Sequence, residues 1–384
     1  MKKRCSWFLT SFFLSSLYAY AVYVKMSFGS DFNRHAIVAE SMTRGGDAPP
    51  HFLYQIVFIL MNWITSASPV VNSMLVIFLI VFITSYFLFY FLSKENSSTV
   101  NKKMVYFVFF ILISHPVTLL FFFDNHLYYG YFTSNVYHNP SIILLKPIAL
   151  VNFFLVCQFL EKPVLKKIGR KNIFLIVLTT ILSIITKPNY SIALLPVVFL
   201  ILLYSTKKKK ENFKRWYLVS LLIFIPSGLI LIWQYMGFYS GGSKNSLGIA
   251  PFQIYLYFSQ LWTVFPKLLL SILFPLSMLC FYGKEMMGNM KVKVSSFMFL
   301  LSILYAYLLY DRVGQGESGA GNFWWSVQIS YFLLLFSCLS FFLKKNSQEE
   351  KRKKRYILFF IIGIHFISGI FWYISNIIPY YWSP

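Results

Sequence analysis

Charged residues fall at intervals along an otherwise apolar chain, and their distribution is the feature that most restricts the fold. From residue 94 onward, apolar blocks are separated alternately by lysine-rich segments and by segments rich in Asp, His, Asn and Gly. The lysine-rich segments are 94–103, 161–171, 207–215, 284–293 and 344–355. Segments dense in Lys and Arg remain on the cytoplasmic side of a membrane. The intervening segments are therefore predicted to face outward.

The composition agrees with a membrane protein and excludes a soluble one. The chain is 58% hydrophobic and 12% charged, with a mean hydropathy of +0.63, which is too apolar for a soluble domain of 384 residues. The net charge is +23, but 27 of the 35 Lys and Arg residues lie near the amino terminus or in the five lysine-rich segments. The excess charge therefore indicates orientation and contact with anionic lipids, and we expect no nucleic-acid partner. The four cysteines show no metal-ligand spacing, so neither structural zinc nor disulfides are expected.

The apolar blocks predict an all-α fold, a polytopic transmembrane helical bundle of about eleven spans that forms a single domain over residues 1–384. Outer loops are expected near 28–69, 124–140, 237–263 and 311–322, with interfacial helices on the outer face. The predicted spans are 7–27, 70–93, 104–123, 141–160, 173–187, 189–206, 216–236, 264–282, 295–311, 323–343 and 356–378.

The first apolar block sets the orientation of the whole chain. Residues 2–4 are Lys-Lys-Arg before an apolar run, which is typical of a signal peptide as well as of an uncleaved span, and either places residue 28 outside. The lysine-rich segment at 94–103 must then be inside. One of the two apolar stretches between them should therefore not cross, and we predict that 51–66 lies along the outer leaflet. The alternative is a short hairpin over 51–93 that reverses the amino-terminal section.

The first outer loop contains a carboxylate next to the membrane. Asp31 follows the first span, and His35 comes four residues later, so the two share a face if this stretch is helical. A carboxylate in this place is able to act as a general base or a metal ligand, whereas a lone Asp is more commonly a helix cap or a solvated charge. The Gly-Gly and Pro-Pro breaks that follow favour the functional interpretation.

This layout resembles that of the class C (GT-C) glycosyltransferases, the multi-spanning enzymes that use lipid-phosphate-linked sugars. In that superfamily the first span ends in an outward loop with an acidic residue, and an aromatic, proline-containing segment then begins a helix beside the membrane. Asp31, Pro49, Pro50, Phe52 and Tyr54 occupy those places here. The resemblance covers most of the chain in hydropathy layout, while its motifs are confined to short outer segments. It implies a GT-C-like fold, with Asp31 as the catalytic acidic residue.

The second outer loop contains a second set of candidate residues. Members of the superfamily often have a further acidic group after an early span, sometimes as a pair, but here Asp124 is followed by Asn125. Asp124 is therefore a catalytic candidate beside Asp31 and His35, although a paired-carboxylate metal site is in doubt. His138 and Asn139 precede Pro140, which is typical of a helix start, and the free N–H groups of such a terminus favour phosphate as well as ordinary capping.

Two of the lysines outside the basic segments are informative, because they lie in or beside predicted spans and precede prolines. Lys146 and Lys187 are each followed by proline. A charge there costs about 2–3 kcal/mol on insertion scales, so it usually has a partner or a function. Snorkelling to the outer headgroups is the simpler interpretation, and binding of a lipid phosphate or diphosphate is the functional one.

The last two outer loops supply the remaining candidates. Arg312 offers a planar donor group for phosphate and Glu317 a further carboxylate, while Trp324 and Trp325 suit anchoring at the membrane interface or stacking on a sugar. The apolar stretch 251–263 is too short to span and is predicted to be a second interfacial helix. Lys267, at the start of the next span, is predicted to snorkel.

Together these residues predict a glycosyltransferase on the outer face, with Asp31 deprotonating an acceptor hydroxyl. The expected partners are a lipid-linked sugar donor, a glycan or lipid acceptor and membrane lipids. No cofactor is required by the residues, although a divalent cation is compatible with them, and no metal ligands are assigned. An O-antigen or exopolysaccharide polymerase and a lipid-linked glycan flippase remain alternatives. We expect a multi-pass protein of the bacterial inner membrane, with the amino terminus in the cytoplasm and the carboxyl terminus outside.

Overall fold

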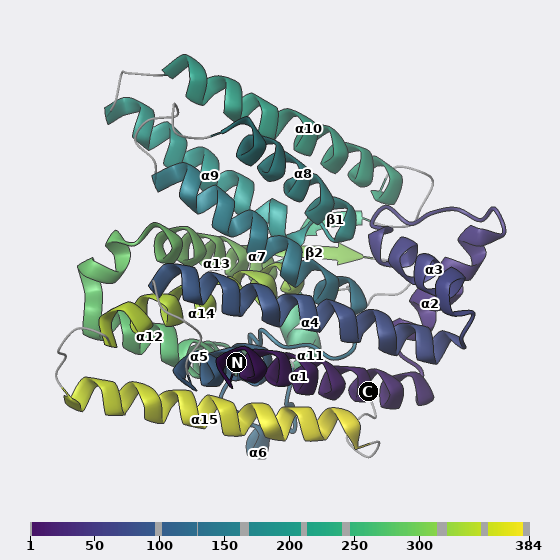
Figure 1. The fold of residues 1–384 in the computed structure, drawn as a ribbon, viewed down its shortest axis with the longest axis horizontal. Coiled ribbons are helices and arrows are strands. Elements are labelled where there is room, and N and C mark those ends of the chain that lie inside the picture. Colours follow the sequence, from purple (N-terminus) through teal and green to yellow (C-terminus); the bar gives the residue numbers. More distant parts are fainter. Residues whose placement is uncertain are drawn as a thin grey trace.

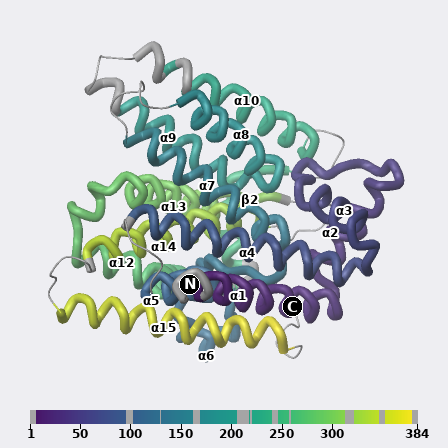
Figure 2. The backbone as a smooth tube through the Cα atoms, in the orientation of Figure 1, coloured from purple at the N-terminus to yellow at the C-terminus, as the bar shows by residue number. Residues whose placement is uncertain are grey.

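The computed structural model describes residues 2–96, 102–128, 130–161, 169–208, 213–239, 246–312, 321–346 and 352–378, and most of them are helical. The long helices pack side by side, with α8, α9 and α10 on one side of the bundle and α1, α5 and α15 on the other (Figures 1 and 2). The helices are α1 (Lys2–Ser27), α2 (Asp31–Thr43), α3 (Leu53–Thr65), α4 (Pro69–Asn96), α5 (Lys102–Ile113), α6 (Phe121–Asp124), α7 (Pro140–Glu161), α8 (Arg170–Thr186), α9 (Asn189–Lys208), α10 (Phe213–Tyr239), α11 (Gln253–Phe258), α12 (Val264–Gly288), α13 (Met290–Leu308), α14 (Trp324–Asn346) and α15 (Arg352–Ile377).

Ion pairs gather the lysine-rich segments at one end of the bundle. Glu95 at the end of α4 pairs with Lys291 at the start of α13 (3.1 Å) and with Lys344 near the end of α14 (3.2 Å). Lys291 also lies 3.7 Å from Glu161 at the end of α7. The starts of α7 and α14 lie at the opposite end, where the predicted outer loops meet. The alternation of basic and chemistry-bearing segments therefore corresponds to two opposite ends of one bundle.

Eight helices in the described part of the chain are long and apolar enough to cross a membrane. They correspond to eight of the predicted spans. The predicted spans 104–123, 173–187 and 189–206 fall instead on α5, α8 and the apolar part of α9 (Asn189–Tyr204), which are shorter. The count of about eleven crossings therefore remains a prediction.

The stretch predicted not to cross is a short helix. At 13 residues, α3 is about 20 Å long, while the hydrocarbon core of a bilayer is about 30 Å thick. It packs against α2 at one end of the bundle (Figure 1).

The all-α prediction needs one small correction. Segments of the third and fourth predicted outer loops pair as an antiparallel two-stranded sheet, in which β1 (Ser246–Ile249) lies beside β2 (Leu309–Arg312). The predicted interfacial helix at 251–263 is only six residues of helix, α11, followed by a single 3-10 turn at Leu261–Thr263. In the described part of these loops, the pairing of β1 with β2 therefore satisfies backbone groups of both segments.

The predicted span at 104–123 ends early because of a proline. Helix α5 stops at Ile113, since Pro116 restrains the residue before it and has no N–H to donate. The chain then crosses the backbone of α15, where a Cβ on Gly369 would lie 2.1 Å from the carbonyl oxygen of Ile113. Only glycine allows this approach, and the N–H of His115 donates to the carbonyl of His365 at 3.2 Å.

Much of the second predicted outer loop is buried. Residues 131–137 are buried in the bundle without helical structure, so their polar groups need partners from side chains. The N–H of Phe132, for example, donates to the hydroxyl of Ser271 at 3.0 Å. The side chain of Asn135 joins this stretch to the segments around it. Its Nδ2 donates to the carbonyls of Ile111 (3.0 Å) and Ser114 (2.8 Å), and its Oδ1 accepts from Lys146 Nζ at 3.0 Å and from the hydroxyl of Tyr18 at 3.1 Å.

These contacts predict different costs for removing the two members of the Asn135–Lys146 pair. Asn135→Ala leaves the Lys146 ammonium and two backbone carbonyls without this partner, and should lower the free energy of unfolding by about 3 kcal/mol or more. Lys146→Met keeps the volume and removes the charge, so it should cost about 1.5 kcal/mol at most. Unfolding in mixed detergent micelles measures both. Equal costs would mean that Lys146 is not held by Asn135.

Candidate functional site

The predicted catalytic carboxylate lies where three helices meet. Asp31 is the first residue of α2, and its Oδ2 accepts a hydrogen bond from Asn139 Nδ2 at 3.1 Å. Asn139 also caps α7, because its Oδ1 accepts from the backbone N–H of Ile142 at 3.1 Å. The helix start predicted at Pro140 is thus confirmed, and both polar atoms of Asn139 are engaged within the protein.

Lys187 is buried in the turn between α8 and α9, close to this carboxylate. Its Nζ lies 4.8 Å from the centre of the Trp325 ring. Burial lowers the pKa of Lys187 to about 8, against the attraction of Asp31 and Asp311. The side chain is therefore mainly a cation at neutral pH. Because it is buried at 6% exposure, it does not snorkel to the surface.

Burial also changes the acidity of Asp31. It raises the pKa of the carboxyl above the usual range, opposed by the charge of Lys187, the Asn139 hydrogen bond and the charge of Arg34. A carboxylate whose pKa lies closer to neutral accepts a proton more readily in a reaction at physiological pH.

Three histidines surround the pair, and all are neutral at pH 7. Burial, aided by the charge of Lys187, lowers the pKa of His35 to about 4 and the pKa values of His51 and His138 to about 3. His35 lies one turn after Asp31 on α2, as predicted, and its Nδ1 is 2.8 Å from Gln55 Nε2. With the amide as donor, the ring N–H of His35 is on Nε2.

A cavity of about 320 Å³ opens beside Lys187. Its polar end is formed by His51, Lys187, Asn189 and Asn322, and the rest of its wall is mainly apolar. The apolar lining includes residues of α9 and α10, which are Ile192, Leu231, Tyr235, Phe238 and Tyr239, and residues of the neighbouring loops and strands, among them Leu247, Leu309 and Phe323. Helix α10 is mostly exposed along its apolar length, so the cavity joins a charged end to a surface suited to lipid. Asp31 does not line the cavity but lies near Lys187, which does.

The rim of the cavity is organised by a second carboxylate. Asp311, in β2, accepts from the side chain of Asn322 at 2.5 Å, and Asn189 donates to the Asn322 carbonyl at 2.8 Å and to the hydroxyl of Ser326 at 3.0 Å. These bonds join β2 to the starts of α9 and α14. Burial raises the pKa of Asp311, and Asn322 and Lys187 oppose that rise.

The other predicted phosphate ligands are not all gathered here. Lys146 lies seven residues beyond Asn139 in α7, which is about 10 Å along the helix axis, and its Nζ bonds to Asn135. The side chain of Arg312 and all of Glu317 lie outside the described residues. The structure thus brings Lys187, His138 and Asn139 to Asp31, whereas the side chain of Lys146 in α7 bonds to the buried loop.

Asp124, the third predicted catalytic residue, belongs to a separate buried cluster. Its carboxylate forms an ion pair with Lys267 inside the bundle, and both side chains are at most 2% exposed. The hydroxyl of Ser259 lies 3.4 Å from Asp124 Oδ2 and accepts from Lys267 Nζ at 2.9 Å. The prediction that Lys267 snorkels is wrong, because the carboxylate of Asp124 holds it inside. Asp124 is correspondingly engaged by its own cation.

The site includes residues that sequence reasoning had not assigned to it. His51 directly follows Pro49 and Pro50, and that rigid position was the available signal for it. Trp325 was predicted to anchor in the interface, but its ring packs against Lys187 and lies 5.7 Å from the His138 ring. Asp311 begins the fourth outer loop, and its pairing with Asn322 had no signal in the sequence.

No group of three or more His, Cys, Asp or Glu side chains suited to a metal ion occurs among the residues that the structure describes. Asp31 has amide and ammonium neighbours, which stabilise a carboxylate without a metal.

The helices and their apolar surfaces define a multi-pass α-helical membrane protein. Comparisons of the chain with protein-family models, with curated proteins and with solved structures give no match. The function is therefore argued from the site itself.

The Asp31–Asn139 contact predicts a measurable change in carboxyl acidity. Asn139→Ala removes a hydrogen bond that lowers the pKa of Asp31, so that pKa should rise further. Asn139→Ser should have the same effect while keeping a capping oxygen for α7. Infrared titration of the protonated carboxyl band follows the change, with Asp31→Asn identifying the band. An unchanged titration in both Asn139 variants would show that the contact does not tune Asp31.

Proposed function

We propose that the protein is a membrane glycosyltransferase that transfers a sugar from a polyprenyl-phosphate-linked donor at the outer face of a bacterial inner membrane. The observation that carries the proposal is the amphipathic cavity with Lys187 and His51 at its polar end, next to the buried carboxylate of Asp31. A charged phosphate on a long hydrocarbon chain has the same division between a polar end and an apolar length. The GT-C-like layout of the sequence supports the same class.

The donor fits the cavity in one direction. Its hydrocarbon chain would lie on Leu231, Tyr235 and Phe238 of α10, where apolar surface is already exposed to lipid. Its phosphate would face the Lys187 ammonium, since charge-assisted hydrogen bonds to phosphate are strongest where water is excluded. The neutral ring of His51 offers a further hydrogen bond at the same end.

In the reaction, Asp31 takes the proton of an acceptor hydroxyl as its oxygen attacks the anomeric carbon. The new bond joins the acceptor oxygen to that carbon, and the bond from the carbon to the phosphate oxygen breaks. The phosphate leaves on the polyprenyl chain with the bonding electrons, and Lys187 stabilises the added negative charge. Asn139 holds the Asp31 carboxylate through a bond anchored on α7.

Replacement of the proposed base tests the chemistry. Asp31→Asn keeps the size of the side chain but cannot accept a proton at neutral pH. Loss of a positioned general base typically costs about 100- to 10,000-fold in rate. Cells that carry this variant should insert the protein normally and fail to build its glycan, measured by labelling of cell-surface polysaccharide.

Asp47→Asn is the matched control, because Asp47 is exposed in the loop after α2. It should leave glycan synthesis close to normal. Normal glycan levels with Asp31→Asn would remove Asp31 from catalysis.

The pKa of Lys187 predicts how phosphate binding depends on pH. A lysine with a pKa of about 8 is about 90% protonated at pH 7 and about 10% protonated at pH 9, so apparent affinity for polyprenyl phosphate should fall about ten-fold over this range. The phosphate itself does not lose charge there, since its second pKa is about 6. Lys187→Arg remains charged and should bind equally at both pH values. Binding of fluorescent polyprenyl phosphate to purified protein measures this. The same decline in both proteins would exclude Lys187 as the cause.

A further inference from the structure

Helix α2 has a second face, turned away from the catalytic candidates. Asp31 and His35 lie on one face, four residues apart. At 100° per residue, Asn33, Ala36, Ile37 and Glu40 lie on roughly the opposite side. The helix that positions Asp31 therefore separates two different environments.

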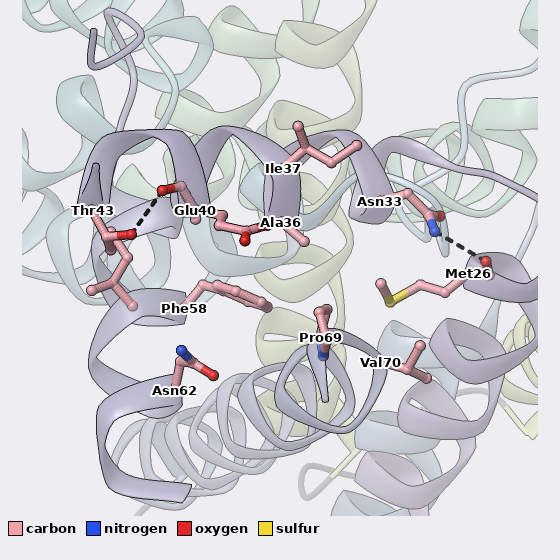
Figure 3. Close-up of a pocket in the computed structure, with 12 residues that line it drawn as sticks. Met26, Asn33, Ala36, Ile37, Glu40, Thr43, Phe58, Asn62, Pro69 and Val70 are labelled. Atoms are coloured by element: carbon pink, nitrogen blue, oxygen red, sulfur yellow. Dashed lines mark hydrogen bonds between the residues drawn. The ribbon is translucent and has the colours of Figure 1, made fainter. Parts of the chain in front are cut away.

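A cavity of about 400 Å³ lies against this second face. Figure 3 shows Asn33, Ala36 and Glu40 of α2 across from Phe58 and Asn62 of α3, with Pro69 and Val70 at the start of α4. Met26, near the end of α1, closes one side. Four helices thus enclose one space at the end of the bundle, and its size is typical of small-molecule sites.

The polar groups in the wall are already hydrogen-bonded within the protein. Asn33 Nδ2 donates to the carbonyl of Met26 at 3.1 Å, and the Thr43 hydroxyl donates to the carbonyl of Glu40 at 2.7 Å (Figure 3). Asn62 Oδ1 accepts from the side chain of Asn72 at 2.7 Å. What remains in the lining is chiefly the hydrocarbon of Met, Ala, Ile, Phe, Pro and Val. Such a wall suits an alkyl chain better than a sugar.

The mouth of the cavity carries both apolar and charged groups. Ile37 at the rim is 67% exposed, and Ile64 near the end of α3 is 81% exposed, so the surrounding surface is one that lipid would cover. Glu40, also in the lining, forms an exposed ion pair with Arg44 at 2.6 Å. This pair presents one carboxylate and one guanidinium on neighbouring turns. A zwitterionic headgroup has the complementary ammonium and phosphate.

We propose that this cavity binds an acyl chain of a zwitterionic phospholipid, with its headgroup on Glu40 and Arg44. Because the chain would fill the space between α2, α3 and α4, it would brace the helix that carries Asp31 from the face opposite the reaction. This site is separate from the cavity beside Lys187, and its test requires no transferase activity.

The test is photocrosslinking of purified protein in detergent with phosphatidylethanolamine that carries a diazirine in one acyl chain. Wild-type protein should be labelled saturably in peptides of α2 and α3, and unlabelled phosphatidylethanolamine should compete. Ala36→Phe fills the cavity, and Ile37→Asp places a carboxylate at its rim on an exposed position where folding should be unaffected. Each should reduce this labelling at least five-fold. Ile64→Asp, on the same hairpin but not in the lining, should be labelled like the wild type.

Three results would overturn the proposal. One is labelling of α2 and α3 no stronger than that of the lipid-exposed helix α10. Another is undiminished labelling in the Ile37→Asp variant. The third is equal competition by palmitate or phosphatidylglycerol, which would exclude the headgroup contact with Glu40 and Arg44.

Discussion

The structure depends on how the backbone of residues 114–139 is satisfied inside the bundle. Spanning segments are normally helical because lipid offers no partners for free N–H and C=O groups, and irregular backbone is tolerated only where protein surrounds it. Here Pro116 ends α5 early, and the stretches 114–117 and 130–137 of the following chain are buried in the bundle, with bonds to α1, α7, α12 and α15. Asn135 replaces much of the missing helical bonding from a single side chain. Ser271 accepts from the N–H of Phe132 at 3.0 Å, and Trp372 donates to the carbonyl of Asn135 at 3.1 Å. Buried polar side chains from α1, α7, α12 and α15 thus bond to this one irregular segment.

That segment ends at Asn139, which also belongs to the candidate functional site. The same residue that begins α7 holds the carboxylate at the start of α2, so the path of the buried loop fixes where Asp31 lies. Lys187 lies near Asp31 at the break between α8 and α9. Its backbone N–H donates to the carbonyl of Ser183, so the end of α8 has a hydrogen-bond partner at this break. Asp31 and Lys187 are both buried, and their mutual attraction does not fully offset the loss of water. The pKa of Asp31 is therefore raised and that of Lys187 is lowered. The electrostatics of the site follow from helix termini meeting at one end of the bundle.

Much of the architecture can be predicted from charge and hydropathy, because the membrane insertion of each segment depends on its own hydropathy and on the charges beside it. The sequence predicts the helical class, the two ends of the bundle, the helical pairing of Asp31 with His35 and the start of α7. It does not predict the buried loop, since the apolar run through 104–123 looks like any span and the bonds of Asn135 join residues from distant segments. Lys146 and Lys267 each have the pattern of a snorkelling lysine, and their partners Asn135 and Asp124 become visible only in three dimensions. The pairing of β1 with β2 likewise joins residues that are 60 or more positions apart in the sequence.

Helix α7 runs from one end of the bundle to the other, so that a movement at one end displaces the other. Glu161 at its far end belongs to the ion-pair network around Lys291, and Asn139 at its near end donates to Asp31. A helix of 22 residues is about 33 Å long, so a tilt of about 5° around the basic end would move Asn139 by about 3 Å. A displacement of that size is enough to break a hydrogen bond. The position of the carboxylate therefore depends on lysines and glutamates that lie across the full length of the bundle from it.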